Sequence, residues 1–305
     1  MSSVCVLCGS ETQAPILTGP DRLLGLPGVY TVVRCRGCGL GRTEPQIPPE
    51  ERAKYYAPEE GGEAGKADRI AMYQSRTAAL VDRAAPPGKN RRVLDIGCGE
   101  GIFLDLMRGR GWEVSGVELG AESSRVARED RGLDVTTGNL SDLRAEPGSF
   151  EAIVMSHVLE HLSDPMEQLR RVGELLAPGG LLWLSLPNYG SLEARLFRGN
   201  WYNWALPPHL FHFNVGAAYM AVGKVGLRVD RITYLPFFST AQSLRYALKR
   251  GALVPAVTPA ASDQTVHDAG KDKLKSIIFR TILTVSHLLG KFLPGEIMEI
   301  QARKP

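Results

Sequence analysis

The 305-residue sequence lacks both a long hydrophobic run and a strong excess of charge of one sign. No uncharged apolar stretch reaches the roughly 18 residues that a membrane-spanning helix needs. The chain also lacks a positively charged and then apolar leader, so we expect a cytoplasmic protein. A formal net charge of +3 is too small to indicate a nucleic-acid-binding surface, and we expect no nucleic-acid partner.

Cysteine is scarce, with five residues, but four of them form two Cys-x-x-Cys pairs. The first pair is Cys5 and Cys8, and the second is Cys35 and Cys38. In a reducing compartment such pairs indicate metal ligands rather than disulfides. Four thiolates complete a tetrahedral Zn²⁺ site and leave no open position, so we predict a structural zinc ribbon over residues 1–45. A redox dithiol is the alternative for one pair, and the second pair argues against it.

Beyond the ribbon, residues 46–67 are rich in Pro, Gly and Glu, which is typical of a linker. Over residues 68–305, apolar strand-like segments alternate with helical segments. This order predicts an α/β domain with a mostly parallel sheet that helices cover on both faces. The clearest helix start has Asp164 as N-cap and Pro165 in the first helical position.

Residues 236–295 separate the last two predicted strands and form an insertion in the domain. Within it, residues 273–293 have one apolar stripe at helical spacing. This pattern fits a helix packed on the domain, or a helix that lies on a membrane surface or covers an apolar substrate. Peripheral contact with the inner face of a membrane is therefore one expectation for this segment.

The most informative stretch is VLDIGCGEG, residues 93–101, in which an apolar strand ends in the acid Asp95. Glycines follow at alternate positions: Gly97, Gly99 and Gly101. A dinucleotide fingerprint would need glycine at position 102, where Ile102 stands, so the spacing favours a cofactor without a pyrophosphate. The next strand ends in Glu118, where a carboxylate can accept two ribose hydroxyls. A plain strand-to-helix turn is the alternative for each glycine.

Together with GVEL, TGNL, SHVLEHL, LAPGG and LPN in this order, the stretch resembles class I S-adenosylmethionine-dependent methyltransferases over residues 93–187. The resemblance implies a doubly wound, mostly parallel seven-stranded sheet and S-adenosylmethionine as cofactor. It places Asp95 near the methionine amino group and the turn of Gly97, Cys98, Gly99 and Gly101 along the methionine portion. Glu118 would hold the ribose, Leu119 would pack on adenine, Asn139 and Leu140 would border the adenine amine, and Ser156 and His157 would border the sulfonium.

The stretch SHVLEHLSDP places His157, Glu160 and His161 at positions i, i+3 and i+4, which share a face if they form one helical turn. One interpretation makes His161 the base that removes the acceptor proton, supported by Glu160. Another makes the three residues ligands of a second, divalent ion. The similar ubiquinone-pathway O-methyltransferases have Glu-x-x-Glu-His for such an ion. A purely structural role is the third interpretation, and all three stay open.

A segment rich in aromatic residues and histidine follows the fifth strand of the domain, where this fold places loops that cover the substrate. Its candidate acceptor-binding residues are Trp201, Tyr202, His209 and His212. Aromatic planes with interleaved polar groups suit a sugar ring or a quinone-like ring. A loop packed by its own aromatic residues is the alternative.

The N-terminal Cys-x-x-Cys ribbon is similar to that of methyltransferases that act on sugars in antibiotic and cell-envelope pathways. We therefore expect methyl transfer to a hydroxyl of a sugar or glycolipid, such as a lipid-linked glycan, with a carbon acceptor ranked second. O-methylation of a polyprenyl or aromatic phenol is an alternative within the same enzyme class. A non-catalytic regulator or scaffold that binds the cofactor is an alternative outside it.

Overall fold

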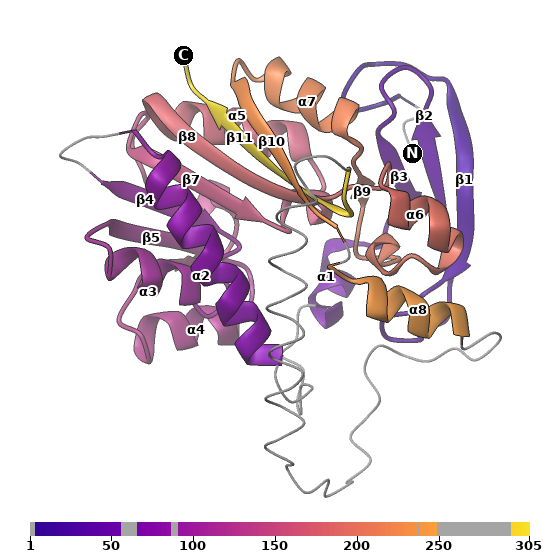
Figure 1. The fold of residues 1–305 in the computed structure, drawn as a ribbon, viewed down its shortest axis with the longest axis horizontal. Coiled ribbons are helices and arrows are strands. Elements are labelled where there is room, and N and C mark those ends of the chain that lie inside the picture. The colour runs from indigo at the N-terminus through magenta and orange to yellow at the C-terminus, as the bar shows by residue number, and fades with distance from the viewer. Residues whose placement is uncertain (1–3, 56–65, 87–90, 237, 249–293) are drawn as a thin grey trace, which may run out of the picture.

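The computed structural model describes residues 4–55, 66–86, 91–236, 238–248 and 294–305 (Figure 1). The amphipathic stretch 273–293 and most of the predicted insertion lie outside these residues. No helix in the described part of the chain is both long and apolar enough to cross a membrane. The described residues form two sheets, a large one that contains the glycine-rich turn and a small one near the N-terminus.

The large sheet has seven strands, as predicted. In spatial order they are β10 (Arg228–Leu235), β11 (Ile297–Arg303), β8 (Leu176–Pro187), β7 (Phe150–Ser156), β4 (Arg92–Ile96), β5 (Glu113–Glu118) and β6 (Asp134–Thr137). Strand β11 is antiparallel to both of its neighbours, and the other neighbouring strands of this sheet pair in parallel. The strand order reverses between β4 and β7, and the carboxyl ends of strands at such a switch point are where open α/β sheets bind ligands.

Side chains that alternate along the strands build two cores, one on each face of the large sheet. Val93, Val154 and Trp183 join one core, whereas Leu94 and Ile153 join the other. The helices on the first face are α2 (Lys66–Ala84), α3 (Ile102–Arg108) and α4 (Ala121–Glu129), and those on the second are α5 (Pro165–Leu175) and α7 (Val215–Lys224) (Figure 1). Burial on both faces explains the nearly continuous apolar runs of these strands and confirms the doubly wound α/β fold.

Helix α5 begins as its sequence predicts. The Asp164 side chain accepts a hydrogen bond from the backbone N–H of Glu167 at 2.9 Å, and Pro165 takes the first helical position. The cap satisfies one of the backbone donors that a helix leaves free at its start. Leu169, Val172 and other apolar residues of the helix are then buried against the sheet.

The small sheet joins the predicted ribbon to a distant part of the chain. Its strands, in order, are β1 (Gln13–Pro20), β2 (Val29–Cys35), β3 (Gly41–Glu44) and β9 (Phe211–His212). The fourth strand comes from the predicted acceptor-binding segment, which follows helix α6 (Leu192–Phe197) and precedes α7. The ribbon therefore shares backbone hydrogen bonds with that segment (Figure 1). The division of the chain at residues 45 and 67 stays a prediction.

Candidate functional site

The glycine-rich turn after β4 depends on backbone conformations that favour glycine. The φ angles of Gly97, Gly99 and Gly101 are +74°, +55° and +78°. A Cβ atom on Gly97 would lie 2.5 Å from Cγ2 of Val158, and one on Gly101 would lie 2.3 Å from Cδ1 of Leu133. A Cβ on Gly99 would meet no described atom within 4 Å. The outer glycines are therefore needed for packing, whereas Gly99 faces open space in which a ligand can approach the backbone.

Glu118 fixes the open side of this turn. One of its carboxylate oxygens accepts from the N–H of Gly99 at 2.8 Å, and the other accepts from the N–H of Gly120 at 2.7 Å. Each carboxylate oxygen has a second lone pair, so Glu118 can also accept from two neighbouring hydroxyls, as the ribose role requires. The next side chain, Leu119, is 55% exposed, an unusual position for a large apolar residue and one that suits a stacked base.

Asp95 lies buried at the end of β4, beside the glycine-rich turn. Burial raises the pKa of its carboxyl well above the usual range, and the negative charge of Glu118 raises it further. A cationic amino group beside these two acids would favour the charged carboxylate. Cys98 also has a pKa raised by burial, and its Sγ would lie 2.7 Å from a Cβ on Gly116. Cys98 therefore packs the turn against β5.

The predicted adenine residues have different exposures. Asn139 is exposed after β6, and its backbone N–H donates to the Asp142 carboxylate at 2.7 Å. Leu140 is buried in the core shared with Ile96 and Val117. Of the two predicted side chains at this end of the site, Asn139 is thus the one accessible from outside.

Ser156, at the end of β7, lies in a hydroxyl cluster that the sequence analysis missed. The hydroxyl of Tyr73 on α2 lies 3.4 Å from Oγ of Ser156 and 2.9 Å from Oγ of Ser185 on β8. Burial raises the pKa of Tyr73, and the charge of Glu299 adds to the effect. No spacing rule singles out Tyr73 within its helix, because its contacts join segments more than eighty residues apart.

His157 directly follows β7 and has a left-handed φ of +57°, which is rare outside glycine and often marks functional sites. Its backbone N–H donates to the Ser185 carbonyl at 3.0 Å, and its ring stacks with Phe238 at 6.4 Å between centroids. Only Leu159–His161 form a short 3-10 helix. His157, Glu160 and His161 therefore do not form one helical turn, although Nδ1 of His157 lies 3.4 Å from Oε1 of Glu160.

Glu160 is a buried carboxylate, 1% exposed. Neither of its oxygens has a hydrogen-bond partner among the described residues, and the 3.4 Å contact with His157 is its only ion pair there. Buried charges are otherwise paired or bound to metals, because an unpartnered charge costs several kcal/mol in roughly apolar surroundings. This carboxylate is therefore a candidate ligand for a cation.

The half-buried imidazole of His161 and the buried imidazole of His209 face Glu160. The rings of His161 and His209 meet edge to face at 4.6 Å between centroids. Nδ1 of His161 lies 3.0 Å from the Pro208 carbonyl, and Nδ1 of His209 lies 3.0 Å from the Asn203 carbonyl. A carbonyl only accepts, so both Nδ1 atoms carry the proton and both Nε2 atoms carry the lone pair.

Glu160, His161 and His209 each offer a ligand atom within 4.8 Å of the other two. Burial lowers the pKa of both histidines, and for His209 the neighbouring histidine charges lower it further. Two neutral imidazoles and one carboxylate are a donor set that suits divalent transition metals. His209 thus takes the place that the sequence analysis gave to His157 in a candidate ion site.

The remaining acceptor candidates have other partners. Nε2 of His212 lies 2.9 Å from Oγ1 of Thr43, and burial lowers the pKa of His212 to about 3. Trp201 is 1% exposed and donates from Nε1 to the buried carboxylate of Glu296 at 3.1 Å. Tyr202 is half-buried, and its backbone N–H donates to Oγ of a serine on α8 (Thr240–Leu248).

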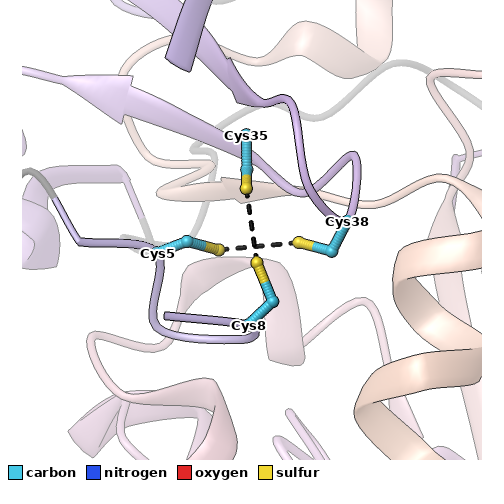
Figure 2. A group of neighbouring side chains, drawn as sticks. All are labelled: Cys5, Cys8, Cys35 and Cys38. Carbon is cyan, nitrogen blue, oxygen red and sulfur yellow. Dashed lines mark hydrogen bonds between the residues drawn. The ribbon is translucent and has the colours of Figure 1, made fainter. Parts of the chain in front are cut away.

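The four predicted metal cysteines come together at the start of the small sheet, and Figure 2 shows their sulfur atoms pointing toward one centre. The Sγ atoms of Cys5 and Cys38 are 3.5 Å apart, as are those of Cys8 and Cys35. A tetrahedral ion with Zn–S bonds of about 2.3 Å would separate them by about 3.8 Å. The four thiolates are therefore compatible with one tetrahedral ion.

Comparison with known proteins identifies the family to which the chain belongs. The methyltransferase domain family matches residues 70–232, which is more than half of the chain, so the chain belongs to this family. The sequence is 40% identical over 124 residues to the ubiquinone biosynthesis O-methyltransferase of Xanthomonas campestris pv. campestris (strain B100), covering 39% of this chain and 51% of that protein. The protein of that name from Chromobacterium violaceum is 36% identical over 115 residues, covering 36% of this chain and 49% of that protein.

The chain thus spans about half the length of these relatives. A solved structure gives a likeness of fold: phosphoethanolamine N-methyltransferase 2 of Haemonchus contortus in complex with S-adenosyl-L-methionine. It matches with a TM-score of 0.50 and 18% identity, covering 75% of this chain and 52% of that chain. With the family match and the seven-stranded sheet, the resemblance to class I S-adenosylmethionine-dependent methyltransferases is confirmed.

Proposed function

We propose that this chain transfers the methyl group of S-adenosylmethionine to a hydroxyl of a small aromatic or polyprenyl phenol. The observation that supports cofactor binding most is the accessible turn at Gly99. The carboxylate of Glu118 fixes this turn by accepting two backbone hydrogen bonds. The names of the relatives favour the phenol over the sugar acceptor that the sequence analysis ranked first. A phenol therefore replaces the sugar as the leading candidate.

Within this proposal, each acid of the turn has a separate task. Glu118 would accept hydrogen bonds from the ribose hydroxyls, and Asp95 would bind the methionine amino group, whose positive charge would favour the ionised carboxylate. Leu119 covers one face of the base, with Asn139 at its edge. S-adenosylmethionine supplies an electrophilic methyl group that needs no further activation, so the remaining residues have to place the acceptor oxygen and remove its proton.

His161 is the proposed base. Its Nδ1 is held by the Pro208 carbonyl, so its lone pair is on Nε2, and its lowered pKa keeps it neutral at pH 7. Nε2 would take the hydroxyl proton as S-adenosylmethionine supplies its methyl group to the oxygen and leaves as a neutral thioether. The carboxylate of Glu160 stabilises the imidazolium that results, and His157, next to Ser156, borders the acceptor.

A divalent ion is the second candidate for the same place, favoured by the buried carboxylate of Glu160, which accepts no hydrogen bond from the described residues. The ligands would be Glu160, His161 and His209. Such an ion would lower the pKa of a bound phenol, so that His161 would not be needed as the base. Elemental analysis separates the two candidates. A metal content that falls by one ion per chain in Glu160→Gln supports the ion, and an unchanged content supports His161 as base.

We also propose that Cys5, Cys8, Cys35 and Cys38 bind a structural Zn²⁺. All four positions would be filled by sulfur, so the ion would stabilise the ribbon and take no part in the chemistry. One equivalent of zinc that survives dialysis, and is lost when Cys35 is replaced by serine, is the expected result.

The enzymatic proposal is tested by turnover. Purified protein is incubated with S-adenosylmethionine labelled in the methyl group and with a panel of catechols, polyprenyl phenols and sugar acceptors. Label in a phenol ether supports the proposal. Label only in a sugar would contradict it and support the sugar acceptor expected from the sequence. Cofactor binding without label in any acceptor favours the non-catalytic regulator or scaffold.

A further inference from the structure

The N-terminal ribbon is in direct contact with the histidines of the acceptor side. Strand β3 pairs with β9 in the register Gly41↔His212 and Arg42↔Phe211. A Cβ on Gly41 would lie 2.9 Å from Cβ of His212, so only glycine lets the two backbones approach this closely. The backbone N–H of Thr43 extends the pairing by donating to the Leu210 carbonyl at 3.0 Å.

The side chain of Thr43 connects two of these histidines. Thr43 is fully buried, and its hydroxyl donates to the carbonyl of His209 at 2.6 Å. The same oxygen lies 2.9 Å from Nε2 of His212. A threonine hydroxyl has one hydrogen, so toward His212 it can only accept. Nε2 of His212 therefore carries the proton, and the lone pair of this neutral ring is on Nδ1.

Strand β3 begins shortly after the second pair of cysteines. The N–H of Gly39, the residue after Cys38, donates to the Cys35 carbonyl at 3.0 Å, and the Cys35 N–H donates to the Leu40 carbonyl at 2.9 Å. The carbonyl of Gly39 accepts hydrogen bonds from the Tyr189 hydroxyl and from Nδ2 of Asn214. Asn214 caps α7 and lies two residues after His212. The histidine segment is thus held at Thr43 and again at Gly39.

We propose that Thr43 is a positioning residue for the acceptor side of the site. The ribbon would then contribute to methyl transfer through the position of these histidines. Its hydroxyl sets the tautomer of His212 and the backbone position of His209. The importance for methyl transfer rests on the proposed function, but the tautomer does not. The cofactor turn belongs to the other sheet, so a change at Thr43 should leave cofactor affinity unaltered.

The test compares Thr43→Val, which keeps the shape and removes the hydroxyl, with Thr43→Ser, which keeps the hydroxyl. Thr18→Val is the matched control, because it removes a threonine–threonine hydrogen bond of 2.9 Å between β1 and β2, away from the histidines. Thr43→Ala removes the same hydroxyl without adding an apolar branch, and it replaces Thr43→Val if that variant does not fold.

The first readout is the ¹⁵N spectrum of the histidine rings. The wild type should show His212 protonated at Nε2, Thr43→Val should lose that tautomer preference, and Thr43→Ser should retain it. The second readout is single-turnover methyl transfer, which should fall about tenfold in Thr43→Val, as expected for one lost hydrogen bond. Thr43→Ser and Thr18→Val should stay close to the wild type, and the affinity for S-adenosylhomocysteine should be equal in all.

An unchanged His212 spectrum in Thr43→Val would overturn the proposal, as would an equal loss of rate in Thr18→Val. If the wild type transfers no methyl group to any acceptor, the proposed function fails. The ring spectra still decide whether Thr43 fixes His212.

Discussion

Among single residues, Glu160 combines deep burial with a carboxylate that no described hydrogen bond stabilises. Its carboxylate is 1% exposed and accepts no hydrogen bond from the described residues, which is unfavourable unless a cation balances the charge. Its neighbours are the neutral rings of His161 and His209 and the partly exposed ring of His157, 3.4 Å from Oε1. An arrangement that costs stability and concentrates acid–base groups is typical of a functional site.

We predict opposite effects of Glu160→Gln on activity and stability. The amide keeps the shape but removes the charge, so methyl transfer should fall by about a hundredfold or more. The free energy of unfolding should not decrease, because the buried charge is gone. Single-turnover assays and urea unfolding measure the two effects. Glu129→Gln on the exposed face of α4 is the control, and a parallel loss of stability and activity in Glu160→Gln would refute a functional role for the charge.

The buried histidines predict a dependence of stability on pH. Burial lowers the pKa of His212 to about 3, from 6.5 in the unfolded chain, and also lowers those of His161 and His209. The unfolded state therefore binds more protons below pH 6.5, and the free energy of unfolding should rise as pH increases from about 3 to about 6.5. Each such histidine adds a slope of up to about 1.4 kcal/mol per pH unit.

Replacing His212 by glutamine should reduce that slope. Urea unfolding of the wild type and of His212→Gln over this pH range measures the difference. Parallel curves for the two proteins would mean that His212 titrates normally in the folded state.

The place of a residue in the site could be predicted from the sequence only where a local sequence pattern surrounds that residue. Asp95 and Glu118 follow strands, so their place at the carboxyl edge of the sheet could be deduced from the sequence. The partnership of His209 with Glu160 could not, because it joins residues 49 apart through the backbone bond from Leu210 N–H to the Glu160 carbonyl. Tyr73 and Thr43 were missed for the same reason, since their contacts are entirely long-range.

At the level of elements, the turn between β4 and α3 combines a structural and a ligand-binding requirement. Gly101 faces Leu133 and Gly97 faces Val158, whereas a Cβ on Gly99 would meet no atom of the described residues within 4 Å. All three have positive φ angles, so any substitution adds backbone strain of roughly 1–2 kcal/mol. The difference between them lies in what a Cβ atom would contact.

Alanine substitutions should therefore separate folding from binding. Gly101→Ala should lower the free energy of unfolding by several kcal/mol, because its Cβ overlaps Leu133 in addition to about 1–2 kcal/mol of backbone strain. Gly99→Ala should cost only the backbone strain, yet weaken S-adenosylhomocysteine binding about tenfold or more. Urea unfolding and titration calorimetry measure both quantities. Undiminished binding in Gly99→Ala would show that the ligand does not approach this glycine.

The elements of the large sheet could be predicted because each one has its own periodicity and its own stop signals, as at Asp164 and Pro165. The two-residue strand β9 could not, since it exists only through its pairing with β3. A strand this short has no alternation of its own, and its partner lies some 170 residues earlier.

At the scale of the whole molecule, the ribbon and the methyltransferase domain are connected through the small sheet. Apolar residues of the ribbon, such as Leu7 and Val32, belong to the same core as Trp204 and Phe211. A ribbon of this size has too little core to fold alone, so a bound ion and this shared core together supply its stability. Within the described ranges, the strands that flank the cofactor turn belong to the other sheet and do not pair with the ribbon.

Removing the metal should therefore affect the acceptor side more than the cofactor side. In Cys35→Ser, we expect a lower melting temperature and slower methyl transfer, with an affinity for S-adenosylhomocysteine within about twofold of the wild type. Calorimetric titration and thermal unfolding of both proteins make the comparison. Loss of cofactor affinity in parallel with activity would contradict the separation of the two sheets.

The central claim is that the turn at Gly99 and the carboxylate of Glu118 form the binding site of a sulfonium nucleoside. Titration calorimetry of the wild type and of Glu118→Ala with S-adenosylhomocysteine tests it most directly. We predict saturable binding to one site per chain in the wild type and at least about a tenfold weaker affinity in the variant, because two hydroxyl contacts are lost. Heat of dilution alone in the wild type, or equal affinities in the two proteins, would contradict it.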